Sequence, residues 1–328
     1  MEEQLAPESL IKRVYVYLMD FRFYIGVIFA VPYLLFGFLV ELALLEWNRT
    51  LFFDSLLKLI FAIMVSLMLL PFIWVANDYF DAPYDLLEPS KRDRNYYCSN
   101  DFKNNPFLGY IALILPLVIS LTLSCFLGLD FLIISILTAL IGYFYSAPPL
   151  RFKEMPVTDF ITHGFYVGGF FFILGGLVIA PLRILLAQPL FLILFFLSVV
   201  DMANIQYNSQ LLDIEIDNEG SQRTTSLWIG KQHSLLILRG LMGLMLACVP
   251  LYLTFNSSLV SIFPLIVINS VFILSLGGIL LYFWFTRGGF EKIKSIQNRT
   301  VWLRHSFIYL FALLSILFIN MPSFLGFI

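Results

Sequence analysis

Two acidic clusters in the sequence have the residue types and the spacing of a divalent-metal site. The first occupies residues 77–85 (N-D-Y-F-D-A-P-Y-D), and the second occupies residues 213–217 (D-I-E-I-D). In each cluster oxygen-bearing residues recur every four positions, which places them on one face of a helix. Mg²⁺ is usually bound by one or two carboxylates, with substrate phosphates completing its coordination. The pattern therefore predicts a paired metal site in an enzyme that acts on a diphosphate.

Solvent-exposed acids at helix ends are the alternative interpretation of either cluster. Acids near a helix C-terminus oppose the helix dipole, so two such clusters would be costly without bound cations. The metal site is therefore the interpretation that we follow. Pro83 can end the first helix, in which case Asp85 would lie in a loop.

The segments around the clusters are those of a membrane protein. The 328 residues are 60% hydrophobic and only 13% charged, and they include 35 Phe and 16 Tyr. Nine apolar stretches are long enough to cross the hydrocarbon core as helices, whereas a β-barrel would show short alternating segments. We expect an all-α membrane protein with nine transmembrane helices, near residues 23–45, 54–76, 106–127, 130–146, 159–180, 188–211, 235–255, 260–285 and 304–326.

Basic residues set the expected orientation of these helices. Of the 20 Lys and Arg residues, all but Arg49, Lys58 and Arg183 fall on the side of the N-terminus. By the positive-inside rule this side is cytoplasmic, and the plasma membrane is the expected location. One domain, residues 1–328, would then expose an N-terminal segment and four loops to the cytoplasm, namely residues 1–22, 77–105, 147–158, 212–234 and 286–303.

The two acidic clusters follow the second and the sixth expected spans. This arrangement predicts two parallel four-helix half-bundles plus a ninth helix around a central cavity. The three cysteines have neither the spacing of a zinc site nor that of a disulfide framework. The formal net charge of −2 gives no indication of a nucleic-acid partner, and we expect none.

The two clusters resemble the paired aspartate signature of the UbiA superfamily of intramembrane prenyltransferases. The segment 145–153 (Y-S-A-P-P-L-R-F-K) is similar to the loop that follows the fourth span in that family. The resemblance extends over nearly the whole chain. It implies that Mg²⁺ binds the diphosphate of an allylic prenyl donor through Asn77, Asp81, Asp85, Asp213 and Asp217.

The resemblance also implies a reaction and roles for further residues. Departure of the diphosphate leaves an allyl cation, which an electron-rich carbon of a lipophilic acceptor attacks before a proton is lost. We expect catalytic roles for Asp78, Asp81, Asp213 and Lys153, with Asp78 either supporting a ligand or accepting a proton. The residues expected to contact diphosphate are Tyr145, Ser146, Arg151, Lys153, Lys91 and Arg94, although topogenic charge also explains the basic ones.

A polar stripe on the sixth span is expected to lie deep in the membrane. Asp201 precedes Asp213 by 12 residues, which is roughly 18 Å along a helix. Asn204 and Asn208 follow it on the same face. An ionisable residue at this depth indicates a functional site. We expect the stripe to line the acceptor cavity, and buried water that satisfies these groups is the alternative.

The acceptor is indicated only by the residues that flank the clusters. The segment from Leu86 to Lys91 (L-L-E-P-S-K) resembles the corresponding segment of the lycopene-elongase-like branch of the superfamily more than that of the quinone-forming members. A carotenoid or other polyene is therefore the expected acceptor. An aromatic quinone precursor and a glycerol phosphate ether lipid are the alternatives, with membrane lipid around the protein in each case. A membrane transporter is the rival class, although transporters more often have broken helices and several midplane charges.

Overall fold

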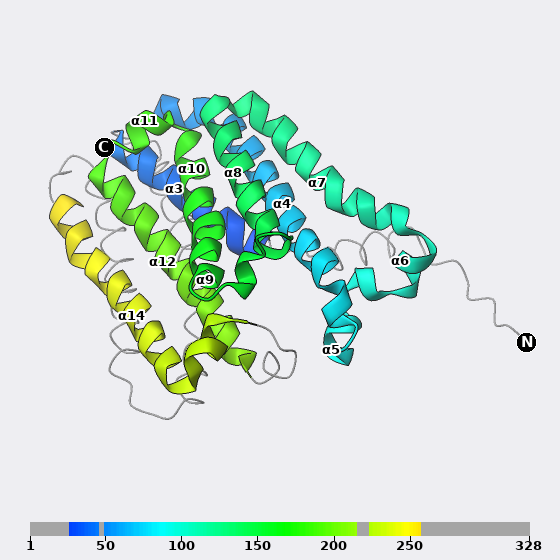
Figure 1. Cartoon of the computed structure of the whole chain (residues 1–328). Helices are drawn as coiled ribbons and strands as arrows, with labels where there is room; N and C mark the ends of the chain where they lie inside the picture. Colours follow the sequence, from blue (N-terminus) through cyan, green and yellow to red (C-terminus); the bar gives the residue numbers. More distant parts are fainter. Residues whose placement is uncertain (1–25, 46–48, 215–222, 257–328) are drawn as a thin grey trace, which may run out of the picture.

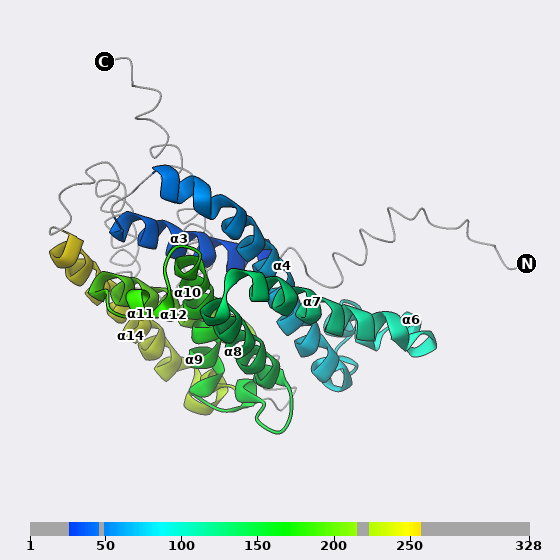
Figure 2. The same cartoon turned by 90° about the horizontal axis from the view of Figure 1, so that it is seen from above.

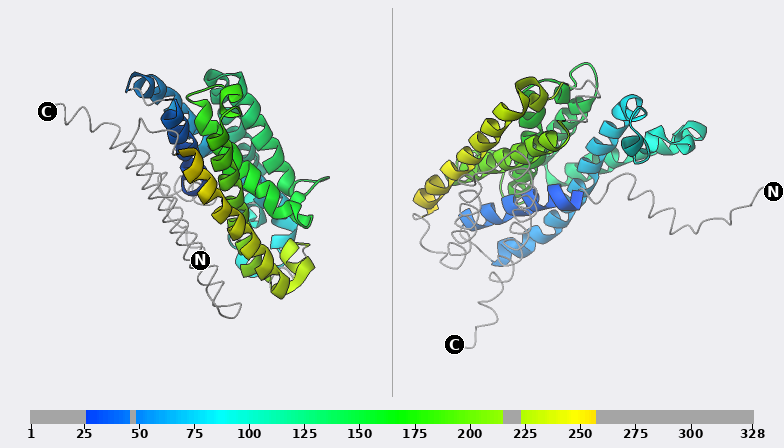
Figure 3. Two further views of the ribbon diagram at one scale, coloured as in Figure 1. Left: turned by 90° about the vertical axis from the view of Figure 1, so that its left-hand side faces the viewer. Right: turned by 90° about the horizontal axis from the view of Figure 1, so that it is seen from below.

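The computed structural model describes residues 26–45, 49–214 and 223–256, and this part of the chain is entirely helical. Figure 1 shows α14 and α7 at opposite edges of the helix bundle, with α12, α10 and α8 between them. Figures 2 and 3 show α5 and α6 projecting from the bundle together with the adjoining ends of α4 and α7. The longer elements are η1 (Gly26–Ala30), α3 (Val31–Leu44), α4 (Arg49–Asp85), α7 (Pro106–Leu127), α8 (Leu129–Ser146), η4 (Gly164–Gly169), α10 (Phe170–Leu177), α12 (Pro189–Leu212) and α14 (Thr225–Asn256). The shorter ones are α5 (Pro89–Arg92), η2 (Tyr96–Cys98), α6 (Asn100–Asn104), η3 (Phe152–Glu154), α9 (Thr158–His163) and α11 (Leu182–Leu185).

Seven of the nine expected spans fall on described helices. Five helical segments are long and apolar enough to cross a membrane: Thr50–Asp85, Pro106–Leu127, Leu129–Ser146, Thr158–Leu177 and Pro189–Leu212. Two shorter apolar helices, Gly26–Leu42 and His233–Met245, match the first and seventh expected spans. Four expected segments lie outside the described residues: the spans 260–285 and 304–326, the loop 286–303 and the N-terminal segment 1–22. The all-α membrane fold is thus confirmed, whereas nine helices, two half-bundles and a central cavity stay predictions.

Helix α4 continues further than the sequence pattern suggested. It runs through Pro83 to Asp85, so the first acidic cluster lies on its last turns and not in a loop. Proline has a helical φ angle but lacks the N–H that would bond to the carbonyl of Tyr79, and the helix ends two residues later. The backbone N–H of Leu86 still donates to the carbonyl of Ala82 at 3.1 Å. Asp85 therefore keeps the helical register that it shares with Asp81.

Helices α3 and α10 pack unusually closely because glycine faces backbone on each side. A Cβ at Gly37 would overlap the carbonyl oxygen of Phe172, and a Cβ at Gly175 would overlap that of Leu34. Small residues at such crossings let helix backbones meet in a membrane, where apolar burial alone does not drive association. The crossing fixes α3 against the inner part of the bundle.

We expect Gly175→Ala to destabilise the protein by about 1–3 kcal/mol, because the overlapping carbonyl belongs to backbone and cannot rotate away. The measurement is thermal unfolding of the purified protein in detergent. Gly240→Ala is the matched control, since a Cβ there meets no atom within 4 Å. Equal unfolding temperatures for the two variants would contradict this account of the crossing.

The polar ends of several helices meet at one end of the bundle. The Asn77 side chain on α4 donates to the Ser146 hydroxyl at the end of α8. The Asp159 carboxylate on α9 accepts hydrogen bonds from the Thr225 backbone N–H at 2.7 Å and from its hydroxyl at 2.6 Å. The start of α14 is thereby attached to α9, and the Val157 N–H, which donates to the Thr225 hydroxyl at 2.7 Å, attaches it to the loop between α8 and α9. This loop and the first acidic cluster thus lie at the same end of the molecule.

Candidate active site

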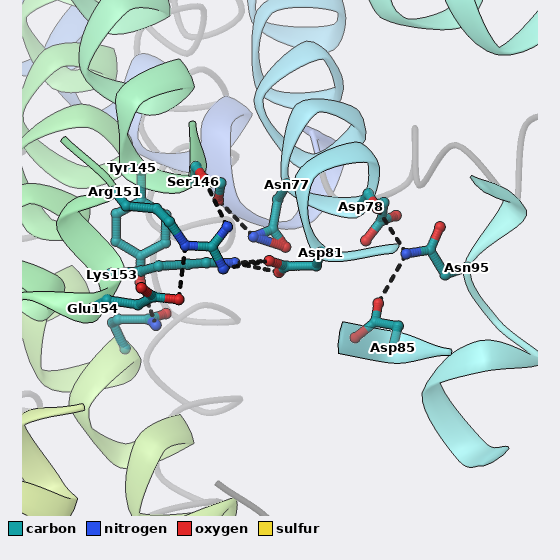
Figure 4. Close-up of polar contacts among 11 residues, drawn as sticks. Asn77, Asp78, Asp81, Asp85, Asn95, Tyr145, Ser146, Arg151, Lys153 and Glu154 are labelled. Carbon is teal, nitrogen blue, oxygen red and sulfur yellow. Dashed lines mark hydrogen bonds and ion pairs between the residues drawn. The ribbon is translucent and has the colours of Figure 1, made fainter. Parts of the chain in front are cut away.

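Asp81 is the centre of an ionic cluster between α4 and the loop that follows α8. Its carboxylate pairs with the Lys153 ammonium and lies 3.3 Å from Nη2 of Arg151. Figure 4 shows both basic side chains reaching across to Asp81 from the segment that holds Glu154. Cations from this loop therefore balance the acid that the sequence pattern assigned to a metal.

The loop itself holds Arg151 in a defined position. Arg151 has a left-handed backbone, with φ of 45°. Its Nε lies 2.7 Å from Glu154 Oε1, and its guanidinium lies 4.7 Å above the centre of the Tyr84 ring. Arg151 is thus oriented by one acid and one aromatic ring in addition to Asp81. A guanidinium fixed in this way is suited to bidentate binding of a diphosphate.

Lys153 is partly buried in the same cluster, with 15% of its side-chain surface exposed. Burial lowers the pKa of its ammonium group, and the adjacent Asp81 carboxylate acts in the opposite direction. The charged form is therefore maintained by an anion beside it. A diphosphate that entered the site could take over this role from Asp81.

Asn77 and Ser146 form a direct link between α4 and α8. Nδ2 of Asn77 donates to Oγ of Ser146 at 2.7 Å, which leaves the amide oxygen of Asn77 out of that bond. Tyr145, the preceding residue on α8, is buried, and its hydroxyl accepts from Nε2 of Gln206 at 2.9 Å. Gln206 lies on α12. Three helices thus converge on the residues that the family resemblance assigned to diphosphate.

Asp78 and Asp85 lie beside Asn95, to the right of the ionic cluster in Figure 4. The amide nitrogen of Asn95 donates to Asp85 Oδ2 at 2.8 Å and to the backbone carbonyl of Asp78 at 2.7 Å. The side chain of Asp78 is buried, with 5% of its surface exposed. The role of Asp78, as support of a ligand or as proton acceptor, stays a prediction.

The oxygen donors present fit Mg²⁺ in their chemistry, because Asn77 supplies an amide oxygen and Asp81 and Asp85 supply carboxylates. Among the described residues, no three acidic, histidine or cysteine side chains converge on one point. Asp81 is held by ion pairs, whereas Asp85 is held by the Asn95 amide.

The second acidic cluster is described only in part. Asp213 is exposed and follows the last residue of α12, and its backbone N–H donates to the Ser209 carbonyl at 3.1 Å. Asp217 lies outside the described residues. The metal role of both residues and the catalytic role of Asp213 stay predictions.

The basic run after the first cluster has local partners. Lys91 lies on α5 and pairs with Glu88 at 3.1 Å, and Arg94 is exposed two residues beyond that helix. Contact of either residue with diphosphate stays a prediction.

The polar stripe of α12 is buried in the bundle. The hydroxyl of Tyr33 on α3 donates to Asp201 Oδ2 at 2.7 Å. Asn204 and Asn208 are also buried, with 0% and 3% exposure. A cavity of about 350 Å³ lies elsewhere, between α4, α7 and α8, and its lining is apolar and includes Phe72, Leu117 and Tyr143. The stripe as the wall of an acceptor cavity therefore stays a prediction.

Four residues of the site were not among the sequence predictions. Tyr84 and Glu154 orient Arg151, Asn95 holds Asp85, and Gln206 holds Tyr145. Glu154 adjoins Lys153 in the sequence, so a search for acids beside the basic loop could have found it. Asn95 and Gln206 act through contacts between separate elements, for which a single sequence carries no spacing signal.

The sequence is similar to a known protein family and to a curated relative. The sequence matches the UbiA prenyltransferase family over residues 29–310. A lycopene elongase/hydratase from Haloarcula japonica is 29% identical over 167 residues, which cover 50% of this chain and 51% of that protein. The alignment thus spans about half the length of this curated relative.

Solved structures share the fold over most of the chain. A structure of digeranylgeranylglyceryl phosphate synthase has a TM-score of 0.66 at 18% identity and covers 93% of this chain and 98% of its own. A UbiA homologue from Archaeoglobus fulgidus bound to GPP and Mg²⁺ has a TM-score of 0.56 at 18% identity, covering 90% and 99%. A UbiA homologue from Aeropyrum pernix K1 has a TM-score of 0.63 at 12% identity, covering 88% and 98%. These identities support likeness of fold alone.

Proposed function

The chain belongs to the UbiA prenyltransferase family, and on this premise we propose that it is an integral-membrane prenyltransferase. It transfers a prenyl group from an allylic prenyl diphosphate to a carbon of a lipophilic acceptor. The bond between the allylic carbon and the diphosphate oxygen breaks, and the diphosphate leaves with the electron pair. A bond from the acceptor carbon replaces it, and the acceptor then loses a proton.

The observation that carries the proposal is the ionic cluster of Asp81, Arg151 and Lys153. Two basic residues of a short loop pair with an acid of the metal motif. A bound metal diphosphate could replace both partners, because Mg²⁺ can pair with the acid and the diphosphate can pair with the basic residues. Asp81 would exchange its cations for Mg²⁺, and Arg151 and Lys153 would exchange Asp81 for diphosphate oxygens. The free and bound sites then have similar charge balance, which limits the desolvation cost of binding.

Each residue of the site has a role in this proposal. Oxygen atoms of Asn77, Asp81 and Asp85 would hold Mg²⁺, and Asp213 and Asp217 would hold it from the second cluster. Bound Mg²⁺ supplies charge that stabilises the leaving diphosphate oxygen. Arg151 and Lys153 bind the same diphosphate, and Ser146 and Tyr145 are placed to orient it by hydrogen bonds. Lys91 and Arg94 would add positive charge at the entrance.

The acceptor that we propose is a polyene. The similarity to the lycopene elongase/hydratase from Haloarcula japonica supports this assignment, as does the sequence of the segment from Leu86 to Lys91. Asp201, Asn204 and Asn208 would line the cavity in which the acceptor lies. A glycerol phosphate ether lipid is the second candidate, because a digeranylgeranylglyceryl phosphate synthase has the same fold.

We further propose that the site faces the cytoplasm. The excess of Lys and Arg at the N-terminal side of the spans supports this orientation. Donor and metal would thus enter from the cytoplasm, and the acceptor would enter from the membrane.

The test is an assay of purified protein in lipid vesicles with Mg²⁺ and allylic prenyl diphosphates of several chain lengths. Lycopene, an aromatic quinone precursor and a glycerol phosphate ether lipid are offered separately, and product mass identifies the acceptor. We expect a prenylated polyene. A prenylated ether lipid or quinone precursor would retain the reaction and reject the polyene assignment. Absence of product and of diphosphate release with every pair would reject the proposed function.

A further inference from the structure

Asn95 connects the loop after α5 to the last turns of α4. Only 2% of its surface is exposed. Its amide nitrogen donates to Asp85 Oδ2 and to the carbonyl of Asp78, and its amide oxygen accepts from the backbone N–H of Tyr97 at 2.9 Å. These partners fix which end of the amide is nitrogen, since the carbonyl needs a donor and the N–H needs an acceptor. Both N–H donors and the carbonyl oxygen of the Asn95 amide thus form hydrogen bonds.

Tyr97, two residues after Asn95, connects this loop to another helix. The Tyr97 hydroxyl donates to the carbonyl of Gly109 on α7 at 2.9 Å. The Tyr97 ring packs edge-on against Phe102 and Tyr79, with ring centres 4.9 Å and 5.3 Å apart. The loop that carries Asn95 thus also contacts α7 through Tyr97, whereas the Asn95 amide itself is placed by its own three hydrogen bonds. This amide forms a rigid support for the Asp85 carboxylate.

Asp85 is a residue that requires such support. It is the last residue of α4, where helices fray, and its charge opposes the helix dipole. The two carboxylates of the motif are also satisfied differently. Asp81 is paired with cations, whereas Asp85 Oδ2 accepts a hydrogen bond from a neutral amide and its Oδ1 lies outside that bond.

We propose that Asn95 is a positioning residue of the Mg²⁺ site, which holds Asp85 in the orientation that binds the metal through Oδ1. This inference rests on the proposed function, and Asn95 acts only through Asp85. A neutral donor orients a carboxylate without competing with the metal as Lys or Arg would. Partners of this kind typically change metal affinity or activity by about 10–100-fold.

The test measures metal binding directly. Mn²⁺ is titrated into purified protein with inorganic pyrophosphate, and free Mn²⁺ is followed by electron paramagnetic resonance. Asn95→Ser is the main variant, because serine can still accept from the Tyr97 N–H but is too short to reach Asp85. We expect its Mn²⁺ affinity to fall by about tenfold. In an Asp85→Ala background the same substitution should have no further effect, because the ligand through which Asn95 acts is gone.

Tyr97→Phe is the matched control. It removes the bond to Gly109 from the same loop and leaves all three hydrogen bonds of Asn95 in place. Its Mn²⁺ affinity should stay within about twofold of wild type. Equal weakening by Asn95→Ser and Tyr97→Phe would show that loop stability alone is responsible and would overturn the inference. Wild-type affinity in Asn95→Ser would also overturn it.

The proposed function and this inference would be contradicted by different results. A wild-type protein that binds no Mn²⁺ with pyrophosphate and transfers no prenyl group would contradict the function itself. A wild-type protein that does both, beside an Asn95→Ser variant of unchanged affinity, would contradict only the role of Asn95. If Asn95→Ser does not fold, Asn95→Ala replaces it: alone it should weaken Mn²⁺ binding by about tenfold, and in the Asp85→Ala background it should have no further effect.

Discussion

Asp81→Asn is expected to lower the rate of prenyl transfer by at least about a thousandfold, which corresponds to roughly 4 kcal/mol of transition-state stabilisation. The amide keeps the size of the side chain but removes the negative charge. That charge is the proposed metal ligand, and it holds Arg151 and Lys153 beside the diphosphate position. The measurement is kcat/KM for the donor at saturating acceptor and Mg²⁺.

Asp93→Asn is the control for this loss. Asp93 lies on the loop after α5, pairs with Arg92 and has 69% of its side-chain surface exposed. Its substitution removes one charge near the same end of the bundle but touches no residue of the site, so transfer should stay within about twofold of wild type. Comparable losses in the two variants would indicate a general electrostatic effect. Normal transfer by Asp81→Asn would refute the assignment of the site.

Lys153→Met is expected to have opposite effects on catalysis and on metal binding. Transfer should slow by about a hundredfold, because a cation no longer stabilises the departing diphosphate. Binding of Mn²⁺ without diphosphate should tighten, because the Lys153 ammonium no longer competes for Asp81. Single-turnover kinetics report the first effect, and electron paramagnetic resonance of Mn²⁺ reports the second.

Lys103→Met is the corresponding control, since Lys103 is an exposed residue of α6. It should change neither quantity. If Lys153→Met weakened Mn²⁺ binding, Lys153 would support the metal ligands instead of exchanging partners with them. The proposed exchange of ion pairs would then be wrong, although the loss of transfer would still place Lys153 in the site.

The positions of the helices could be predicted because the membrane leaves few alternatives. A lipid-embedded segment must satisfy its backbone internally, so a long apolar run is read as a helix. The expected spans 106–127 and 130–146 agree closely with α7 and α8. The sequence left open whether α4 ends at Pro83 or continues to Asp85, because proline disfavours a helix without always ending it, and the structure shows that it continues.

Residue types, their spacing and the family resemblance could predict which residues belong to the site, but not how they contact one another. The acids on α4 are visible as a spacing, whereas the pairing of Asp81 with Lys153 joins residues 72 positions apart and depends on how α4 and α8 pack. The contacts of Asn95 and Gln206 depend on the same tertiary arrangement. Neither amide belongs to a periodic pattern, so local sequence could not identify them.

The most direct test is a structure of the protein with Mg²⁺ and a prenyl thiodiphosphate, whose carbon–sulfur bond resists ionisation. The account predicts that Asp81 has left Arg151 and Lys153 and coordinates Mg²⁺, and that both basic side chains contact diphosphate oxygens. A structure in which the diphosphate lies elsewhere, while Asp81 remains paired with Lys153, would contradict it.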